Sequence, residues 1–173
     1  MLRLAALARS RDPLDLAAPA WQQAGREAER AAAPRLGRGL DGGVADAALL
    51  RLAWSGPWPA AHPLVAETVD RVLAELSTGP FVHRYSPEFD DGVQSGQGAS
   101  LEASFWAVRA EAALGRWEAA HERMERLVGW AGELGLLSVS ADPVSLASLG
   151  DRPHVGAHLA LVEAAAALAS GPA

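Results

Sequence analysis

The sequence predicts an all-α fold, a partial α/α toroid built from about three pairs of outer and inner helices. Half of the 173 residues are hydrophobic and many of these are alanine, a composition typical of helix-rich globular chains. Segments that are apolar all round alternate with segments that have one apolar stripe. The all-apolar segments begin near Ala45, Ala99 and Val155, about 55 residues apart, which indicates a structural repeat.

The first part of the chain is expected to contribute little to the core. Residues 1–19 contain two helix-breaking prolines and are predicted to be poorly ordered, so the folded domain is predicted to span residues 20–173. A helix is predicted over residues 20–33, where the apolar face is thin and consists mostly of alanine.

Two segments have the single apolar stripe of a surface helix. In residues 64–77 the stripe consists of Leu64, Val65, Val69, Val72, Leu73 and Leu76. In residues 117–134 it consists of Trp117, Ala120, Met124, Leu127, Val128, Ala131 and Leu134. Because the rest of each segment is charged or polar, both are predicted to be outer helices.

Residues 45–54, 99–114 and 154–169 are apolar almost all round, which is typical of helices enclosed by others. A long polar loop precedes the second and third of these segments, whereas the turns that follow the inner helices are shorter. A ligand cleft is therefore predicted at the end where the inner helices begin and offer unpaired N–H groups. An arc of three pairs has two open flanks, so we expect self-association or pairing with a missing N-terminal half.

Charge and composition argue against several classes of function. A net charge of −6 argues against nucleic acid as the main partner, because phosphate contacts need a basic surface. The absence of cysteine excludes disulfides and thiolate chemistry. No apolar run approaches the roughly 18 residues needed to span a bilayer, and the start lacks the pattern of a signal peptide. A cytoplasmic protein without membrane contact or cofactor is expected.

The polar loop within residues 81–106 holds the densest group of side chains able to bind a ligand. They are His83, Arg84, Tyr85, Glu88, Asp90, Asp91, Gln94 and Gln97. The acids lack the spacing of a calcium loop, so a solvated loop is the favoured interpretation. His154 and His158 have the spacing of a metal-binding pair on a helix, but a third ligand is absent and a structural role is favoured.

Other local features are assigned to packing. Trp54 and Trp58 flank a turn on the side with short loops, where core or interface packing is favoured over sugar stacking. Ser104 and Ser138 lack the context of an activated nucleophile and are given no catalytic role.

Three long segments, in order, carry a resemblance to a known family. They are DAALLRLAWSGPWPAAHPLVAETVDRVLAEL, HRYSPEFDDGVQSGQGASLEASFWAVRAEAALGRWEAAHERMERLVGWAGELGLLS and ADPVSLASLGDRPHVGAHLALVEAAAAL. From about Trp21 to Ala167 the chain resembles the C-terminal half of the catalytic domain of glycoside hydrolase family 15, the glucoamylase and bacterial trehalase group. The resemblance implies an (α/α)6 toroid and inverting hydrolysis of α-glucosides. Inversion uses two carboxyl groups roughly 6.5–9.5 Å apart, one acid and one base.

The resemblance also implies roles for individual residues. Arg84 and Tyr85 resemble the family's substrate-binding Arg-Tyr pair, and Gln97 stands where an acid is usual. The general base normally follows a Leu-Leu-Ser, but here Val139 occupies that position and cannot accept a proton from water. The family's general acid lies in the N-terminal half, for which this chain has no counterpart.

The expected protein is therefore a family 15-like domain fragment that is catalytically degenerate. It has no catalytic residue, and it has Arg84, Tyr85 and Gln97 as contacts for an α-glucoside or oligosaccharide. One alternative is a carbohydrate-binding or scaffold module that pairs with another chain. A second is an unrelated helical-repeat interaction protein, which would bind no sugar and would use a groove on its inner helices.

Overall fold

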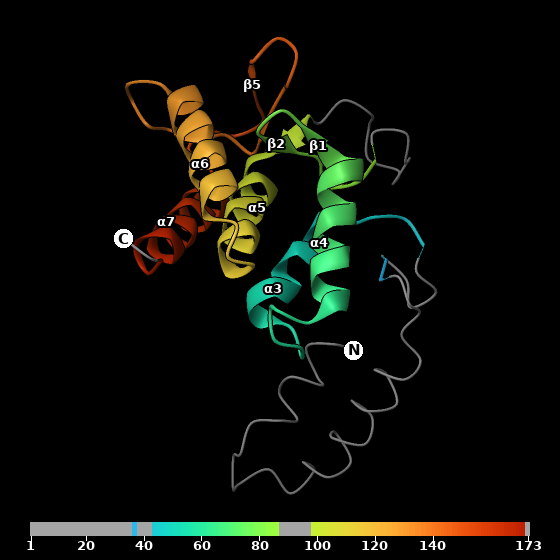
Figure 1. Cartoon of the computed structure of the whole chain (residues 1–173). Coiled ribbons are helices and arrows are strands. Elements are labelled where there is room, and N and C mark those ends of the chain that lie inside the picture. The colour runs from blue at the N-terminus through green and yellow to red at the C-terminus, as the bar shows by residue number, and fades with distance from the viewer. Residues whose placement is uncertain (1–35, 38–42, 87–97, 172–173) are drawn as a thin grey trace, which may run out of the picture.

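A computed structural model describes residues 36–37, 43–86 and 98–171, which form a mostly helical structure (Figure 1). The helical elements are η1 (Ala47–Arg51), α3 (Leu52–Ser55), α4 (Pro63–Leu76), α5 (Leu101–Ala113), α6 (Trp117–Ala131) and α7 (Val155–Ala169). The predicted helical class is confirmed. The helix predicted over residues 20–33 and the segment 1–19 lie outside the described residues. Among the described helices, none is long and apolar enough to cross a membrane.

A small antiparallel sheet, which the sequence did not predict, joins the loops at one end of the helices. Its strands are β1 (Ser77–Thr78), β2 (Phe81–Val82), β3 (Ala99–Ser100), β4 (Ser140–Ala141) and β5 (Ser148–Leu149), paired in that order. Ser77 pairs with Val82, and Ser100 pairs with Ser140. Each strand has two residues, too few for the alternation by which a strand is recognised in sequence.

Helix α5 is the centre of the molecule and packs against α6, α7, η1 and α3 (Figure 1). Ser100 caps its N-terminus, because the Oγ atom accepts a hydrogen bond from the amide of Ala103. Its buried residues are Leu101, Ala103, Ser104, Phe105, Ala107, Val108, Ala110, Glu111 and Ala112. The prediction that this helix lies inside is confirmed for most of its surface, although Glu102, Trp106, Arg109 and Ala113 form one face that is not fully buried.

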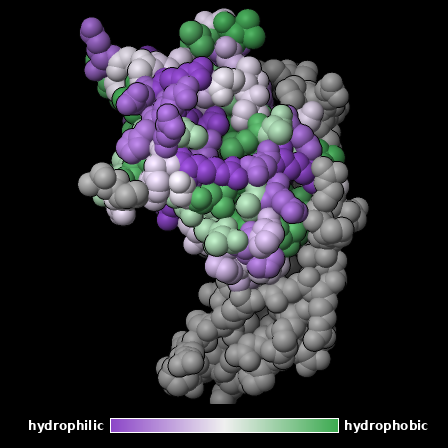
Figure 2. Space-filling view, in the orientation of Figure 1, coloured by the Kyte–Doolittle hydropathy of each residue, from purple (hydrophilic) through white to green (hydrophobic). Residues whose placement is uncertain are grey.

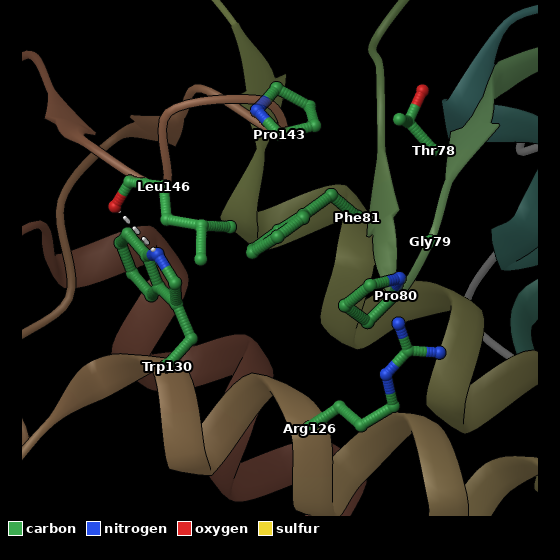
Figure 3. Close-up of a pocket in the computed structure, with 8 residues that line it drawn as sticks. All are labelled: Thr78, Gly79, Pro80, Phe81, Arg126, Trp130, Pro143 and Leu146. Carbon is green, nitrogen blue, oxygen red and sulfur yellow. Dashed lines mark hydrogen bonds between the residues drawn. The ribbon is translucent and has the colours of Figure 1, made fainter.

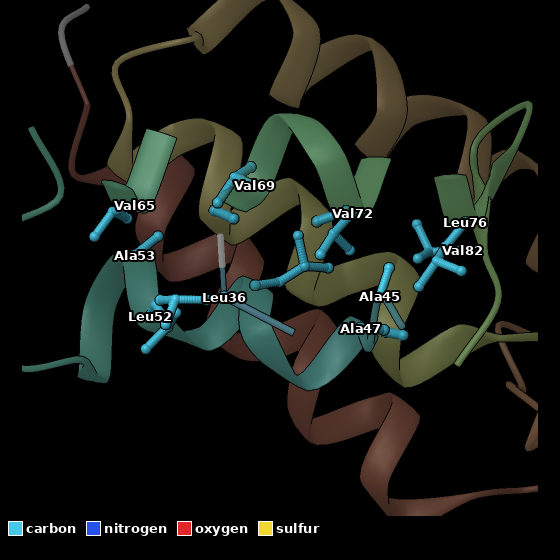
Figure 4. Close-up of a cluster of buried hydrophobic side chains, with 14 residues drawn as sticks. Leu36, Ala45, Ala47, Leu52, Ala53, Val65, Val69, Val72, Leu76 and Val82 are labelled. Carbon is cyan, nitrogen blue, oxygen red and sulfur yellow. The ribbon is translucent and has the colours of Figure 1, made fainter. Parts of the chain in front are cut away.

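One core cluster fills the space between η1, α3, α4 and α5 (Figure 4). Helix α4 begins at Pro63, and the Nδ1 atom of His62 accepts a hydrogen bond from the amide of Leu64. The predicted apolar stripe is confirmed: Val65, Val69, Val72 and Leu76 are buried, and Leu64 and Leu73 pack against the cluster. The helix predicted over residues 45–54 is instead a 3-10 turn followed by one α-helical turn.

A second cluster joins α5, α6 and α7. Helix α6 ends at Ala131, because Gly132 adopts a left-handed conformation with φ +69°. The prediction that the helix and its buried stripe continue to Leu134 is wrong: Leu134 is 78% exposed, and Val128 is exposed as well.

Helix α7 is enclosed on one side only. Its small residues Ala157, Ala160 and Ala164 are buried in the second cluster against α5. On the opposite face, Val155, Leu159 and Val162 are 70%, 59% and 64% exposed. The prediction that this helix is enclosed by others is therefore wrong, since the described residues cover only one of its faces.

The surface seen in the same orientation is mostly polar, with apolar side chains between the polar ones (Figure 2). At the top of that view the loop between β4 and β5 protrudes and carries apolar side chains. Val144 and Leu146 are the exposed large hydrophobic residues of this loop.

Candidate functional site

The first turns of α5 and α7 are tied together at the end of the molecule that carries the sheet. The amide of Leu101, at the start of α5, donates a hydrogen bond to the carbonyl of Val139 at 3.2 Å. The amide of His154, just before α7, donates to the carbonyl of Leu137 at 2.7 Å. One segment, residues 137–139, thus positions the N-termini of both helices, and these termini favour electron-rich ligand groups.

His154, just before α7, and His158, within α7, both accept backbone hydrogen bonds in this region. The Nδ1 atom of His154 accepts the amide of Ala157 at 3.3 Å and so caps the helix. The Nε2 atom of His158 accepts the amide of Leu137 at 3.2 Å. Among the described residues, no group of three or more His, Asp or Glu side chains could hold a metal ion. The structural interpretation of both histidines is confirmed.

Ser104 is also structural. It is buried, its hydroxyl donates to the carbonyl of Ser100 at 2.7 Å, and it accepts the amide of Val82 at 2.9 Å. The hydroxyl of Ser138 donates to the carbonyl of Ser140. The hydroxyl of Ser104 thus links α5 to β2, and that of Ser138 forms a local hydrogen bond within its own segment.

Val139 lies within the segment that joins the two helix N-termini. Its amide donates to the carbonyl of Asp151 at 3.1 Å, and its carbonyl receives the amide of Leu101. Its half-buried side chain stands beside Gly150, where an added Cβ would lie 3.0 Å from the Cβ of Val139. This position therefore offers an aliphatic group and no atom that can exchange a proton.

Arg84 and Tyr85 follow β2 and lie together. The guanidinium carbon of Arg84 is 5.7 Å from the centroid of the Tyr85 ring, within the range of a cation–π contact. The carbonyl of Arg84 accepts the amide of Ala47 at 3.0 Å, which fixes the pair beside the start of η1. Arg84 is exposed, so its donors face solvent. Gln97, together with Glu88, Asp90, Asp91 and Gln94, lies outside the described residues.

His83 precedes this pair and is partly buried. Its amide donates to the carbonyl of Leu76 at 2.8 Å, and its Nε2 atom lies 3.4 Å from the hydroxyl oxygen of Thr78. Burial lowers the pKa of its imidazole from the ordinary value of 6.5, although a hydrogen bond with the backbone of Gly98 acts in the opposite direction. The imidazole is therefore neutral at pH 7 and able to donate one hydrogen bond and accept another.

The sequence interpretation missed Glu102, in the first turn of α5. A Cβ added at Gly156 would lie 3.2 Å from the Oε2 atom of Glu102 and 2.9 Å from the Cε1 atom of His154. The carboxylate and the imidazole thus share the same space beside the start of α7. An acid in the first turn of an inner helix was the available signal, because a carboxylate there is stabilised by the helix dipole.

The sequence interpretation also missed charged side chains on helices that it predicted to be apolar. The guanidinium of Arg51 lies 5.3 Å from the centroid of the Trp106 ring, and that of Arg109 lies 4.6 Å from that of Trp54. Arg109 also forms an ion pair with Glu163 of α7. Trp54 and Trp58 pack against the first core cluster, as predicted.

Over 120 residues the chain is similar to known trehalases. It is 34% identical to the trehalase of Mycolicibacterium smegmatis and 35% identical to that of Mycobacterium tuberculosis. It is 32% identical to the trehalase of Thermoplasma acidophilum. Each match covers 69% of this chain but only 18% to 20% of the trehalase. No protein-family model matches the chain.

Solved glycosidase structures share the fold. A wild-type glycosidase superposes with a TM-score of 0.77 at 19% sequence identity. A variant glycosidase in complex with glucose gives the same values. Both matches cover 98% of this chain and 50% of the glycosidase chain.

The described helices therefore form half of a glycosidase fold, and the chain spans about half the length of the solved glycosidases that it matches. The chain is a partial homologue of trehalases of the glycoside hydrolase family 15 type, and the resemblance noted in the sequence is confirmed.

Proposed function

We propose that this chain forms one arc of an α/α toroid of the glucoamylase and trehalase class and does not hydrolyse α-glucosides by itself. The helical fold, its match to half of a glycosidase and the similarity to trehalases support the toroid. Two carboxyl groups on opposite sides of the scissile bond are needed for an inverting mechanism. At the expected base position this chain has a valine.

The observation that carries the proposal is the place of Val139. It follows the Leu-Leu-Ser motif, and its main chain is bonded to Leu101, at the N-terminus of α5. A base at this position would face the end of the molecule where α5 and α7 begin, which we call the ligand end. It could activate a water molecule there. Valine can exclude water but cannot take a proton, so inverting hydrolysis lacks its base here.

Hydrolysis assays test the proposal directly. The purified chain is incubated with trehalose, maltose and starch, and released glucose is measured. We expect no release above that of buffer. Clear turnover that Arg84→Ala abolishes, in a variant whose circular dichroism spectrum is unchanged, would overturn the proposal.

The ligand end is proposed to retain sugar binding through Arg84, Tyr85 and Gln97. Arg84 is exposed and can donate several hydrogen bonds to hydroxyl groups. Calorimetric titration with trehalose and maltose is expected to show weak binding that Arg84→Ala reduces at least about threefold. Arg126→Ala is the matched control, since Arg126 is exposed on α6, away from the N-termini of α5 and α7, and should leave the affinity unchanged.

A second candidate function is that of a module that pairs with another polypeptide. The observation that favours it is the exposed face of α7, formed by Val155, Leu159 and Val162. The partner we propose is the helical segment that carries the complementary arc of the toroid. The structural match, which covers nearly all of this chain but half of each glycosidase, supports this choice of partner.

Sedimentation velocity and the upstream coding DNA test the pairing. We expect the isolated chain to associate with itself through α7, because apolar surface of this extent is unfavourable in water. Val162→Glu should shift it toward monomer, whereas Val128→Glu, on the exposed side of α6, should not. A wild-type chain that stays monomeric at high concentration, with no complementary arc encoded upstream, would exclude this function.

A further inference from the structure

A pocket of about 390 Å³ lies at the sheet end of the molecule, beside α6 (Figure 3). It is an open pocket lined by the C-terminal half of α6, the β1–β2 turn and the loop that joins β4 to β5. Arg84, Tyr85 and Val139 are not among its lining residues. Its volume falls at the lower end of the range of small-molecule pockets, roughly 300–1,000 Å³.

The walls of the pocket are mostly apolar. The rings of Phe81 and Trp130 meet edge to face, with centroids 5.7 Å apart and an angle of 83° between their planes. Pro80 and Pro143 complete the apolar lining from the two loops (Figure 3). A planar aromatic ring suits such walls, because aromatic groups prefer offset or edge-to-face contact with each other.

Leu146 closes one side of the pocket in an unusual conformation. Its φ angle is +59°, in the left-handed region that leucine rarely adopts, and its side chain is 57% exposed. Its carbonyl accepts the indole N–H of Trp130 at 3.0 Å (Figure 3). The conformation closes the short loop between the paired strands β4 and β5, in which the amide of Leu146 donates to the carbonyl of Asp142 at 2.8 Å.

The loop that carries Leu146 is held by Asp142. The carboxylate accepts the amide of Val144 at 2.9 Å and the hydroxyl of Ser145 at 2.7 Å. The hydrogen bond from Ser145 is the largest cause that lowers the pKa of the Asp142 carboxyl, and the bond from Val144 acts in the same direction. The loop is therefore fixed by its own hydrogen bonds while Leu146 stays directed at the pocket (Figure 3).

Arg126 is the charged residue among the described lining residues and lies at the edge of the pocket. Its guanidinium approaches the β1–β2 turn, where a Cβ added at Gly79 would lie 3.3 Å from its Nη2 atom. Its ion pair with Glu122 is long, 3.8 Å, and both side chains are more than half exposed. Such an exposed ion pair contributes little to stability, so the guanidinium of Arg126 retains donors for an incoming anion.

We propose that this pocket binds a small aromatic carboxylate. The ring lies against Trp130, Pro80 and Leu146, and the carboxylate receives hydrogen bonds from Arg126. A sugar fits these walls less well, because its many hydroxyl groups would meet few polar partners there. The proposal does not depend on the role of the ligand end.

Three probes with the same ring separate the parts of the proposal. Phenylacetate is an anion, 2-phenylethanol is neutral and 2-phenylethylamine is a cation. The indole N–H resonance of Trp130, assigned with Trp130→Phe, reports occupancy because this group is bonded to the loop at Leu146. We expect phenylacetate to shift it saturably and to bind about tenfold more tightly than 2-phenylethanol. The cation should bind most weakly.

Variants test which side chains are responsible. Arg126→Gln should remove the preference for phenylacetate over 2-phenylethanol, whereas Arg152→Gln, the same charge change elsewhere, should keep it. Leu146→Asp should weaken phenylacetate at least about tenfold, and folding should persist because the side chain is exposed and aspartate tolerates a left-handed conformation. The proposal fails if phenylacetate at about 20 mM leaves the Trp130 resonance unmoved, or if all three probes bind equally.

Discussion

Helices α5 and α7 are both largely apolar, yet their surroundings differ. In α5, nine of 13 residues are buried, and helices lie on several sides of it. In α7, three of 15 residues are buried, all of them alanines that face α5. The opposite face of α7 shows Val155, Leu159 and Val162 to solvent. An apolar sequence thus indicates that a helix can be enclosed, while its neighbours decide whether it is.

The difference also separates two kinds of helix contact. Helix α5 meets α6 through a buried ion pair, in which Arg123 bonds both carboxylate oxygens of Glu111. It meets α7 mainly through small residues, with the ion pair of Arg109 and Glu163 near the surface. The stability of the chain should therefore depend on α5 and its contacts with α6 far more than on the open face of α7.

The largest effect is expected from Phe105→Ala in α5. Phe105 is fully buried, so its removal should leave a cavity and cost about 3–5 kcal/mol of unfolding free energy. Leu159→Ala on the open face of α7 should cost less than about 1 kcal/mol. Urea unfolding followed by circular dichroism measures both, and similar losses would contradict the contrast between the two helices.

The next largest effect is expected at the buried ion pair. Arg123→Ala leaves Glu111, whose side chain is 5% exposed, without its partner and should cost about 3 kcal/mol. Arg109→Ala breaks the pair with the more exposed Glu163 and removes the contact with the Trp54 ring, and together these losses should cost about 1 kcal/mol. Equal losses in urea unfolding would mean that burial does not distinguish the two pairs.

An intermediate effect is expected on the two faces of α7 itself. Ala160→Leu adds volume where α7 packs on α5 and should cost about 1–3 kcal/mol. Ala166→Leu adds the same volume on an exposed face and should change the stability by no more than about 0.5 kcal/mol. Thermal unfolding of the two variants tests this, and a large loss for Ala166→Leu would show that this face is covered.

The smallest effect is expected on the pH dependence of stability, through His83, which follows β2. Burial lowers the pKa of His83 in the folded chain below its unfolded value near 6.5, so the unfolded chain takes up more protons as the pH falls. The contribution of His83 to stability is complete above that value and is lost as the pH drops toward the folded pKa. Urea unfolding between pH 5 and 8 should show a steeper fall for wild type than for His83→Gln.

The parts of the fold that sequence could predict are those with a clear period. The stripe of α4 was predicted, because its apolar residues recur at helical spacing and Pro63 and His62 define its start. The end of α6 was missed, since the apolar residues continue past Gly132, where the backbone turns. The sheet was missed because two residues per strand leave no pattern.

The candidate site divides in the same way. A structural role for His154 and His158 could be predicted, because the sequence offers no third metal ligand beside them; which backbone amides they accept could not. Glu102 was overlooked, since its nearness to His154 depends on how α5 and α7 pack and not on local sequence. The pocket between Phe81, Trp130 and Leu146 joins three distant segments and had no signal in the sequence.

By itself the sequence determined the alternation of helices, the relation to glycosidases and the valine at the expected base position. These depend on local period and on residue identity, which are properties of the chain alone. Only the tertiary structure decided which apolar helix is enclosed, which charges pair and where a pocket opens. The physical reason is that burial and electrostatic environment belong to neighbours in space, and a sequence names a residue without naming what surrounds it.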